Sequence, residues 1–105
     1  MAYEFFPQSV ANSIPTLYSQ EKAGDQAIVH AKFFTPDSDW TWFVLEYDPE
    51  QGLFFGLVCG QEKELGYFRL DELQTSKGPM GLAIERDIHW KPKTLAEIKA
   101  KKYVV

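Results

Sequence analysis

The sequence has a single cysteine, Cys59, so it cannot form an internal disulfide. A lone cysteine is typical of proteins that stay in a reducing compartment. No apolar run is long enough to cross a bilayer. The first residues lack the cationic region of a secretory signal, and Pro7 and Pro15 interrupt the apolar residues that follow. These absences predict a cytoplasmic protein without a membrane partner.

Motifs with a defined chemistry are also scarce. The sequence has no paired cysteines and no HxxxH or HExxH spacing, which excludes the common zinc sites. It has no G-x-S-x-G nucleophile elbow, and the glycines at Gly78 and Gly81 come without the lysine of a phosphate-binding loop. We therefore predict no cofactor and no metal, and a binding protein rather than an enzyme.

Basic residues are absent from a long central stretch. Residues 33–62 contain six acidic residues and no lysine or arginine, and residues 1–90 carry fourteen acidic and six basic residues. Residues 91–105 reverse the balance, with five lysines and one glutamate. Such an acidic body repels nucleic acid and attracts basic partners, so nucleic acid is expected to bind only through the lysine-rich end of the chain.

What the chain does contain is enough apolar material for one core. Its 105 residues are 45% hydrophobic, 15% aromatic and 25% charged, as expected for a single globular domain. We expect an N-terminal helical segment over 1–16, an antiparallel sheet core over 27–90 and a C-terminal helix over 94–102. The predicted fold class is α+β, an antiparallel meander sheet of about five strands with short terminal helices.

A period of two predicts strands over 27–34, 40–47, 53–59, 65–69 and 82–90. The first four are joined by links too short for a parallel crossover, so they form an antiparallel meander. Gly52 suits a positive φ in the turn after residue 47. Alternation in the second strand separates one face from the other: Trp40, Trp42, Val44 and Glu46 against Thr41, Phe43, Leu45 and Tyr47.

The last predicted strand alternates in the same way. Four apolar side chains are expected to point inward: Leu82, Ile84, Ile88 and Trp90. Three polar ones are expected to point outward: Glu85, Asp87 and His89. Arg86 shares the inward parity, so we expect it to lie at an edge or to pair with an acid.

Proline and capping residues mark the helices. Pro7 suits the first position of a helix over 7–14, and a short helix is predicted over 71–76. Thr94 and Glu97 form a capping box at the start of the last helix. Leu95 and Ile98 should face the core there, and Glu97 should pair with Lys101.

The two tryptophans form the preferred candidate for a binding surface. Trp40 and Trp42 share one strand face beside the acidic residues Asp37 and Asp39. If this face is exposed, indoles flanked by carboxylates suit a basic partner or peptide. If it is inward, the indoles are core residues, which is the commoner role of aromatic side chains in small sheets.

Two weaker candidates would support an enzyme. Glu85, Asp87 and His89 are spaced along one strand, nearly 7 Å apart at alternate positions, so they converge poorly unless His30 joins them from a neighbouring strand. Cys59 would need a nearby base such as a histidine, and a strand cysteine is more often a small buried residue.

Several segments together resemble a bacterial domain-of-unknown-function family, number twenty-nine fifty-eight. The resemblance lies in residues 33–42, 52–60, 64–68 and 81–87, and it extends from about Leu17 to Lys93. The family has no assigned activity, so no catalytic residue is transferred. The resemblance implies an accessory role in mobile DNA, because family members occur on plasmids, phages and conjugative elements.

Three functions therefore remain open. The first is a protein-binding module linked to mobile genetic elements. In a more specific version of this hypothesis, the module acts against restriction or defence enzymes by imitating DNA. The second is a small enzyme that uses Cys59 or the face of Glu85, Asp87 and His89, and the third is a weak nucleic-acid binder that uses the C-terminal lysines.

Overall fold

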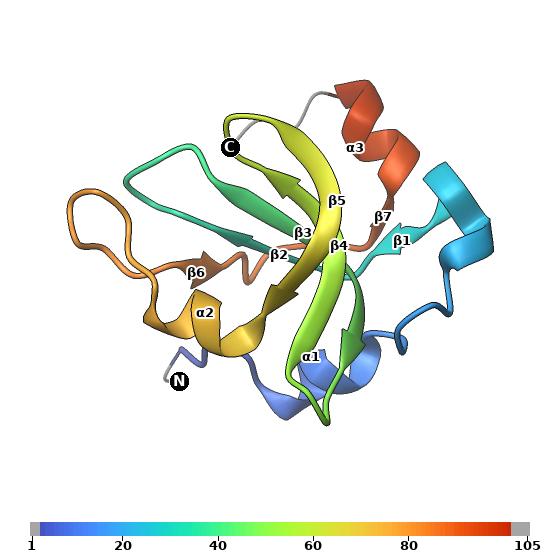
Figure 1. Cartoon of the computed structure of the whole chain (residues 1–105), viewed down its shortest axis with the longest axis horizontal. Coiled ribbons are helices and arrows are strands. Elements are labelled where there is room, and N and C mark those ends of the chain that lie inside the picture. Colours follow the sequence, from blue (N-terminus) through green and yellow to red (C-terminus); the bar gives the residue numbers. More distant parts are fainter. Residues whose placement is uncertain (1–2, 102–105) are drawn as a thin grey trace.

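The computed structural model describes residues 3–101, and an antiparallel five-stranded sheet forms its centre (Figure 1). Four strands follow one another as a meander, and the fifth pairs with the outer side of the first, giving the order β5-β4-β3-β2-β6. The predicted α+β class is confirmed. The strands are β2 (Ala31–Phe34), β3 (Thr41–Asp48), β4 (Leu53–Cys59), β5 (Lys63–Arg69) and β6 (Glu85–Arg86).

The remaining elements lie at the ends and connections of the sheet. A two-stranded ribbon pairs β1 with β7, and α3 follows β7 directly. In Figure 1, α1 and α2 lie in the lower half of the view, and α3 lies at the upper right. These elements are α1 (Gln8–Ser13), the 3-10 helix η1 (Glu21–Gln26), β1 (Ile28–Val29), α2 (Leu70–Thr75), β7 (Lys93–Thr94) and α3 (Leu95–Lys101).

Both faces of the sheet are buried under separate coverings. We call them the α1 face and the α3 face. The α1 face packs Phe33, Val44 and Phe54 against residues 5–14 and the inner side of α2. The α3 face packs Phe43 and Leu57 with residues of β1, α3 and the segment before β7. The residues of β4, and those of β3 as far as Val44, alternate between the two faces, as a pleated strand requires.

The first predicted strand is divided. Residues 28–29 pair with β7 in the ribbon, whereas residues 31–34 pair with β3 in the main sheet. His30 lies at the break and donates its backbone N–H to the carbonyl of Val44 at 2.8 Å. A single continuous strand over 27–34 was therefore wrong in detail, because the chain leaves the main sheet to cover its α3 face.

A β-bulge corrects the predicted faces of the second strand. The register between β3 and β4 shifts between Val44 and Glu46, so that Glu46 lies opposite Phe55 and Tyr47 opposite Phe54. The extra residue reverses the alternation beyond it. Tyr47 consequently joins the α1 face, where it stacks on Phe54, and Glu46 turns to the α3 face.

The predicted strand over 82–90 is also corrected. Only residues 85–86 pair with β2. Leu82 and Ile88, expected inward, are 50% and 60% exposed. The segment crosses from one face to the other, since Ile84 packs on the α1 face and Trp90 on the α3 face. A regular strand could not place Ile84 and Trp90 on opposite faces, because residues an even number of positions apart lie on the same face.

The helices follow the capping signals closely. Pro7 is the N-cap of α1 rather than its first residue, and α2 begins one residue earlier than predicted. The capping box is confirmed, since Glu97 N–H donates to Thr94 Oγ1 at 3.1 Å and Thr94 N–H to Glu97 Oε1 at 3.3 Å. The side chain of Lys101 and residues 102–105 lie outside the described part, and so does the predicted Glu97–Lys101 pair.

Two smaller points complete the fold. Gly52 adopts the expected positive φ, 60°, in the turn between β3 and β4. The 3-10 helix η1 is kinked at Gly24. No helix within residues 3–101 combines the length and the apolar character needed to cross a bilayer.

Candidate functional site

The tight connection between β2 and β3 positions Trp40. Thr35, which is buried, accepts the backbone N–H of Trp40 on Oγ1 at 3.0 Å and donates its own N–H to the carbonyl of Trp40 at 3.0 Å. The indole of Trp40 stacks on that of Trp42, with ring centroids 6.0 Å apart and planes 27° from parallel. The pair therefore forms one continuous aromatic surface.

This surface is exposed at one end and buried at the other. Trp40 is 41% exposed, whereas Trp42 is half-buried and packs against the α1-face cluster. Trp40 lies between two hollows, one of about 440 Å³ with Val58 and one of about 310 Å³ with Trp42. The sequence left open whether the two indoles are core or surface residues. In the structure Trp42 packs partly into the core, whereas Trp40 lies on the surface.

Carboxylates border the larger hollow, but they are not the two that the sequence suggested. Glu62 and Glu64 line it beside Trp40, together with Gln61. Asp39 is exposed in the preceding turn. We call Trp40, Trp42, Val58, Glu62 and Glu64 the tryptophan surface.

Asp37 has a structural role instead. Its Oδ2 atom accepts the backbone N–H groups of Met80 and Leu82, at 2.8 and 3.3 Å. Its Oδ1 atom is buried and has no hydrogen-bond partner within residues 3–101. Asp37 thus anchors the loop after α2 to the β2–β3 connection, and its charge is directed into that loop.

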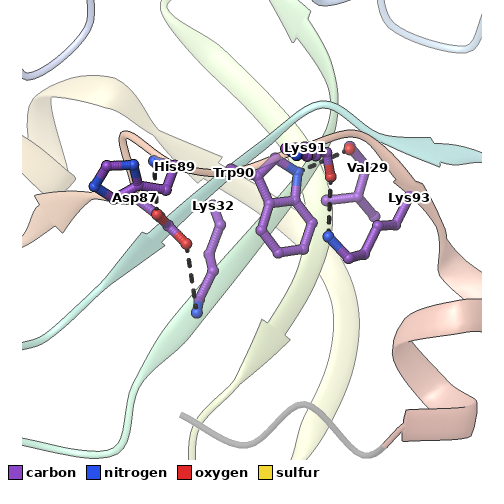
Figure 2. A network of polar contacts seen from close by, with 7 residues as sticks. All are labelled: Val29, Lys32, Asp87, His89, Trp90, Lys91 and Lys93. Atoms are coloured by element: carbon purple, nitrogen blue, oxygen red, sulfur yellow. Dashed lines mark hydrogen bonds and ion pairs between the residues drawn. The ribbon is translucent and has the colours of Figure 1, made fainter.

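Glu85, Asp87 and His89 do not meet in one site. Asp87 accepts the backbone N–H of His89 on Oδ1 at 2.9 Å, and its Oδ2 atom lies 4.0 Å from Lys32 Nζ (Figure 2). Glu85 is exposed on β6. Within residues 3–101, no group of three or more histidine, cysteine or carboxylate side chains could hold a metal ion.

A polar hollow does bring Asp87 close to two other candidates. His30 and Arg86 line it with Asp87, in a volume of about 290 Å³, whereas Glu85 and His89 do not. Burial lowers the pKa of His30, and Arg86 donates to the carbonyls of Glu4 and Phe5, both at 3.0 Å. Arg86 therefore lies at an edge, as predicted, with backbone carbonyls as partners.

Cys59 is buried at the end of β4. Burial raises the pKa of its thiol, and the charge of Lys63 opposes that effect. A nucleophilic cysteine needs the opposite, a lowered pKa that favours the thiolate. Cys59 fits the role of a small apolar residue in the α3-face cluster.

The lysines near the C-terminus are partly engaged within the chain. Lys99 pairs with Asp25 at 2.8 Å. Lys93 Nζ lies 4.4 Å from the centroid of the Trp90 ring and donates to the carbonyl of Lys91 at 3.3 Å (Figure 2). These contacts hold the covering of the α3 face in place and reduce the charge available to phosphates.

Sequence reasoning missed a hollow on the α3 face, around Glu46. This carboxylate is 4% exposed and accepts the backbone N–H groups of Tyr18 and Gln20, both at 2.8 Å. One signal was present: Glu46 is the only charged residue in the apolar stretch 40–47. Its parity suggested the other face, because the bulge at Leu45 has no sequence signature.

One family model matches this chain over almost its whole length. Residues 9–101 match the model described as "Protein of unknown function (DUF2958)". The chain belongs to the DUF2958 family. No curated protein and no solved structure matches it. Membership in DUF2958 confirms the resemblance seen in the sequence, and it supplies no activity.

Proposed function

We propose that this DUF2958 protein is a non-enzymatic binding module that recognises a basic segment of a partner protein at the tryptophan surface. The observation that carries the proposal is the stacked pair of indoles, with Trp40 41% exposed beside a hollow lined by Glu62 and Glu64. An aromatic face attracts lysine and arginine side chains through its quadrupole, and nearby carboxylates add to that attraction.

The acidic residues support direct recognition of a protein better than imitation of DNA. DNA presents phosphates in regular rows, so a mimic needs its carboxylates on one surface. Here Asp37 binds the loop after α2, and Glu46 is buried on the α3 face. Asp48 and Glu50 lie at the β3–β4 turn, at the opposite end of β3 from Trp40.

The setting of this activity is also part of the proposal. A lone buried cysteine suits the bacterial cytoplasm. The resemblance noted in the sequence implies mobile DNA, so a host restriction or defence enzyme with a basic surface is the partner class that we propose.

Binding of a five-residue lysine peptide tests the surface directly. We expect the peptide to shift the NMR signals of the Trp40 and Trp42 indole N–H groups, and a glycine–serine peptide of the same length to leave them unchanged. Trp40→Ala should weaken binding about fivefold or more. Higher salt should weaken it further, because the carboxylates are exposed.

Ile88→Ala provides the matched control, since Ile88 is an exposed apolar residue that does not belong to the tryptophan surface. It should leave the affinity unchanged. Equal losses in the Trp40 and Ile88 variants, or binding that ignores salt, would contradict the proposal. Capture of host proteins on immobilised wild-type and Trp40→Ala protein then identifies the partner.

A further inference from the structure

The hollow around Glu46 lies on the α3 face, between residues 18–27, β5 and the start of α3. Its volume is about 290 Å³, and most of its wall is apolar. We call it the Glu46 groove. Three large side chains at the groove are strongly exposed, with Tyr18 at 64% and Leu65 and Tyr67 at 52% each. Its apolar wall consists of Ala27, Leu45, Phe55, Leu65, Tyr67 and Leu95.

The carboxylate of Glu46 belongs to this groove and is held there by backbone N–H groups. Its two oxygens each accept one backbone N–H, from Tyr18 and from Gln20. Among the side chains that the structure describes, no lysine, arginine or histidine pairs with it. A carboxylate can accept about four hydrogen bonds, and the described residues supply two of them to Glu46. A buried charge in this state gains from a cation.

Three segments combine to hold Glu46 in place. The bulge at Leu45 turns Glu46 to the α3 face. The Gln20 side chain donates hydrogen bonds to the carbonyls of Leu45 and Ile28, at 2.8 and 3.0 Å. Tyr18 adopts a φ of 70°, a left-handed conformation that is costly for a residue with a side chain. Backbone strain of this kind concentrates at binding sites.

The groove also borders an open edge of the sheet. β5 is the outermost strand, so one side of its backbone has no partner strand in the described part of the chain. Leu65 and Tyr67 lie opposite Leu57 and Phe55, which places them on the α3 face beside Glu46. An extended segment that pairs with β5 would send alternate side chains into the groove.

We propose that the Glu46 groove receives an arginine side chain from an extended segment of a partner protein that pairs with β5. Arginine fits because its stem packs on apolar walls, its planar head stacks on aromatic rings, and its parallel N–H groups match the two carboxylate oxygens. The rings of Phe55 and Tyr67, with centroids 5.0 Å apart, supply the aromatic wall. This inference does not rest on the tryptophan surface.

N-acetyl-arginine amide is the first probe. It should shift the backbone amide signals of Tyr18 and Gln20, since both amides donate to the Glu46 carboxylate. N-acetyl-citrulline amide has nearly the same shape without the charge and should bind about tenfold more weakly. Equal binding of the two probes would overturn the proposal, and so would amide signals that do not move.

A peptide separates a protein partner from free arginine. A five-residue peptide with a central arginine between valine and threonine residues should bind at least about tenfold more tightly than the amide, through added backbone pairing. It should also protect the β5 amides from hydrogen exchange. If the peptide gains nothing over the amide, the site does not take a protein segment. Equal affinity of the matching lysine peptide would reject the assignment to arginine.

Variants locate the binding. Glu46→Gln should remove the preference for arginine over citrulline, and its fold is checked by circular dichroism because Glu46 also holds the Tyr18 segment. Leu65→Ala with Tyr67→Ala changes only exposed side chains and should weaken the peptide about tenfold. Ile88→Ala should leave this affinity unchanged, and Trp40→Ala should weaken it less than the groove variants do. If Trp40→Ala weakened binding as much as the groove variants do, the proposal that the groove is a separate site would be overturned.

The dependence of the NMR signals on protein concentration tests whether a second copy of the chain occupies the groove. We expect the Tyr18 and Gln20 amide signals to be independent of protein concentration when no probe is present. Signals that shift on concentration, together with a larger sedimentation coefficient, would assign the groove to a second copy and overturn the proposal.

Discussion

The two faces of the central sheet are closed in different ways. The α1 face is closed by stacked and edge-on rings, in which Phe54 contacts Phe6, Phe33, Tyr47 and Phe68. The α3 face is closed mainly by aliphatic side chains such as Val29, Leu45, Leu95 and Ile98, with Phe43 and Trp90 in contact beside them.

The difference follows from which part of the chain supplies each covering. Residues 5–14 and α2 cover the α1 face, and residues 27–29 and 90–98 cover the α3 face. β5, at the edge of the sheet, is only partly covered, since Phe68 packs in the α1-face cluster whereas Leu65 and Tyr67 are 52% exposed. Each face therefore keeps one hollow there, the tryptophan surface on one side and the Glu46 groove on the other.

Truncation of one core residue on each face gives the largest expected effect. Phe54 is completely buried among four rings, so Phe54→Ala should lower the free energy of unfolding by about 3–5 kcal/mol. Leu95→Ala, at the first turn of α3, should cost about 2 kcal/mol. Urea unfolding measures both. A larger loss for Leu95→Ala would mean that the α3 face is the principal core.

The capping box gives the next effect and is confined to one covering. Thr94→Ala removes the acceptor for the Glu97 N–H and should cost about 1 kcal/mol. Hydrogen exchange should accelerate in α3 and stay unchanged in α1. Thr75→Ala is the control, because the exposed Thr75 hydroxyl donates to the Asp71 carbonyl at 2.9 Å outside any cap. Faster exchange in α1 would show that the coverings are coupled.

Alanine substitutions at two glycines test the tryptophan surface. We expect a loss of stability at Gly60 and no loss at Gly66. A β-carbon at Gly60 would lie 2.5 Å from ring atoms of Trp40, whereas one at Gly66 would have nothing within 4 Å. Gly60→Ala should displace the indole, alter its NMR signal and cost about 0.5 kcal/mol, because the exposed ring can move. Gly66→Ala should be neutral or stabilising, since glycine weakens strands. An unchanged Trp40 signal in Gly60→Ala would mean that the ring does not rest on Gly60.

The smallest expected effect is a dependence on pH near the polar hollow. Burial lowers the pKa of His30 in the folded chain below its ordinary value of 6.5. The unfolded chain therefore binds the proton more readily, and the free energy of unfolding should decrease as the pH falls through about 6.5 towards the folded pKa. His30→Gln should flatten this slope in urea titrations between pH 7 and 5. His89→Gln should retain it, and a slope that His30→Gln leaves intact must come from another group.

Local signals sufficed for much of this fold. The strand over 53–59 and the capping box at Thr94 were predicted where they occur, since strand alternation and helix capping depend on neighbouring residues. Short links between strands were enough to predict the meander. The strand over 82–90 failed because its residues divide between two faces, a requirement that arises only when distant segments pack together.

The candidate sites show the same limit. The sequence identified Trp40 and Trp42 as partners on one face, which is a matter of spacing. It assigned Asp37 to that surface, but the loop residues whose amides bind it lie more than forty positions away. Glu46 went unnoticed because its accepting role depends on the backbone of Tyr18 and Gln20, which a bulge brings into reach.

By itself the sequence determined the four-strand antiparallel meander, the capping box of the last helix and the acidic character of the chain, because these follow from composition, alternation and the length of the links. Only the tertiary structure decided which carboxylates are exposed, buried or bonded to distant backbone. The physical reason is that burial and hydrogen bonding of a charge depend on segments far apart in sequence, as for Glu46, whose carboxylate accepts the backbone N–H groups of Tyr18 and Gln20.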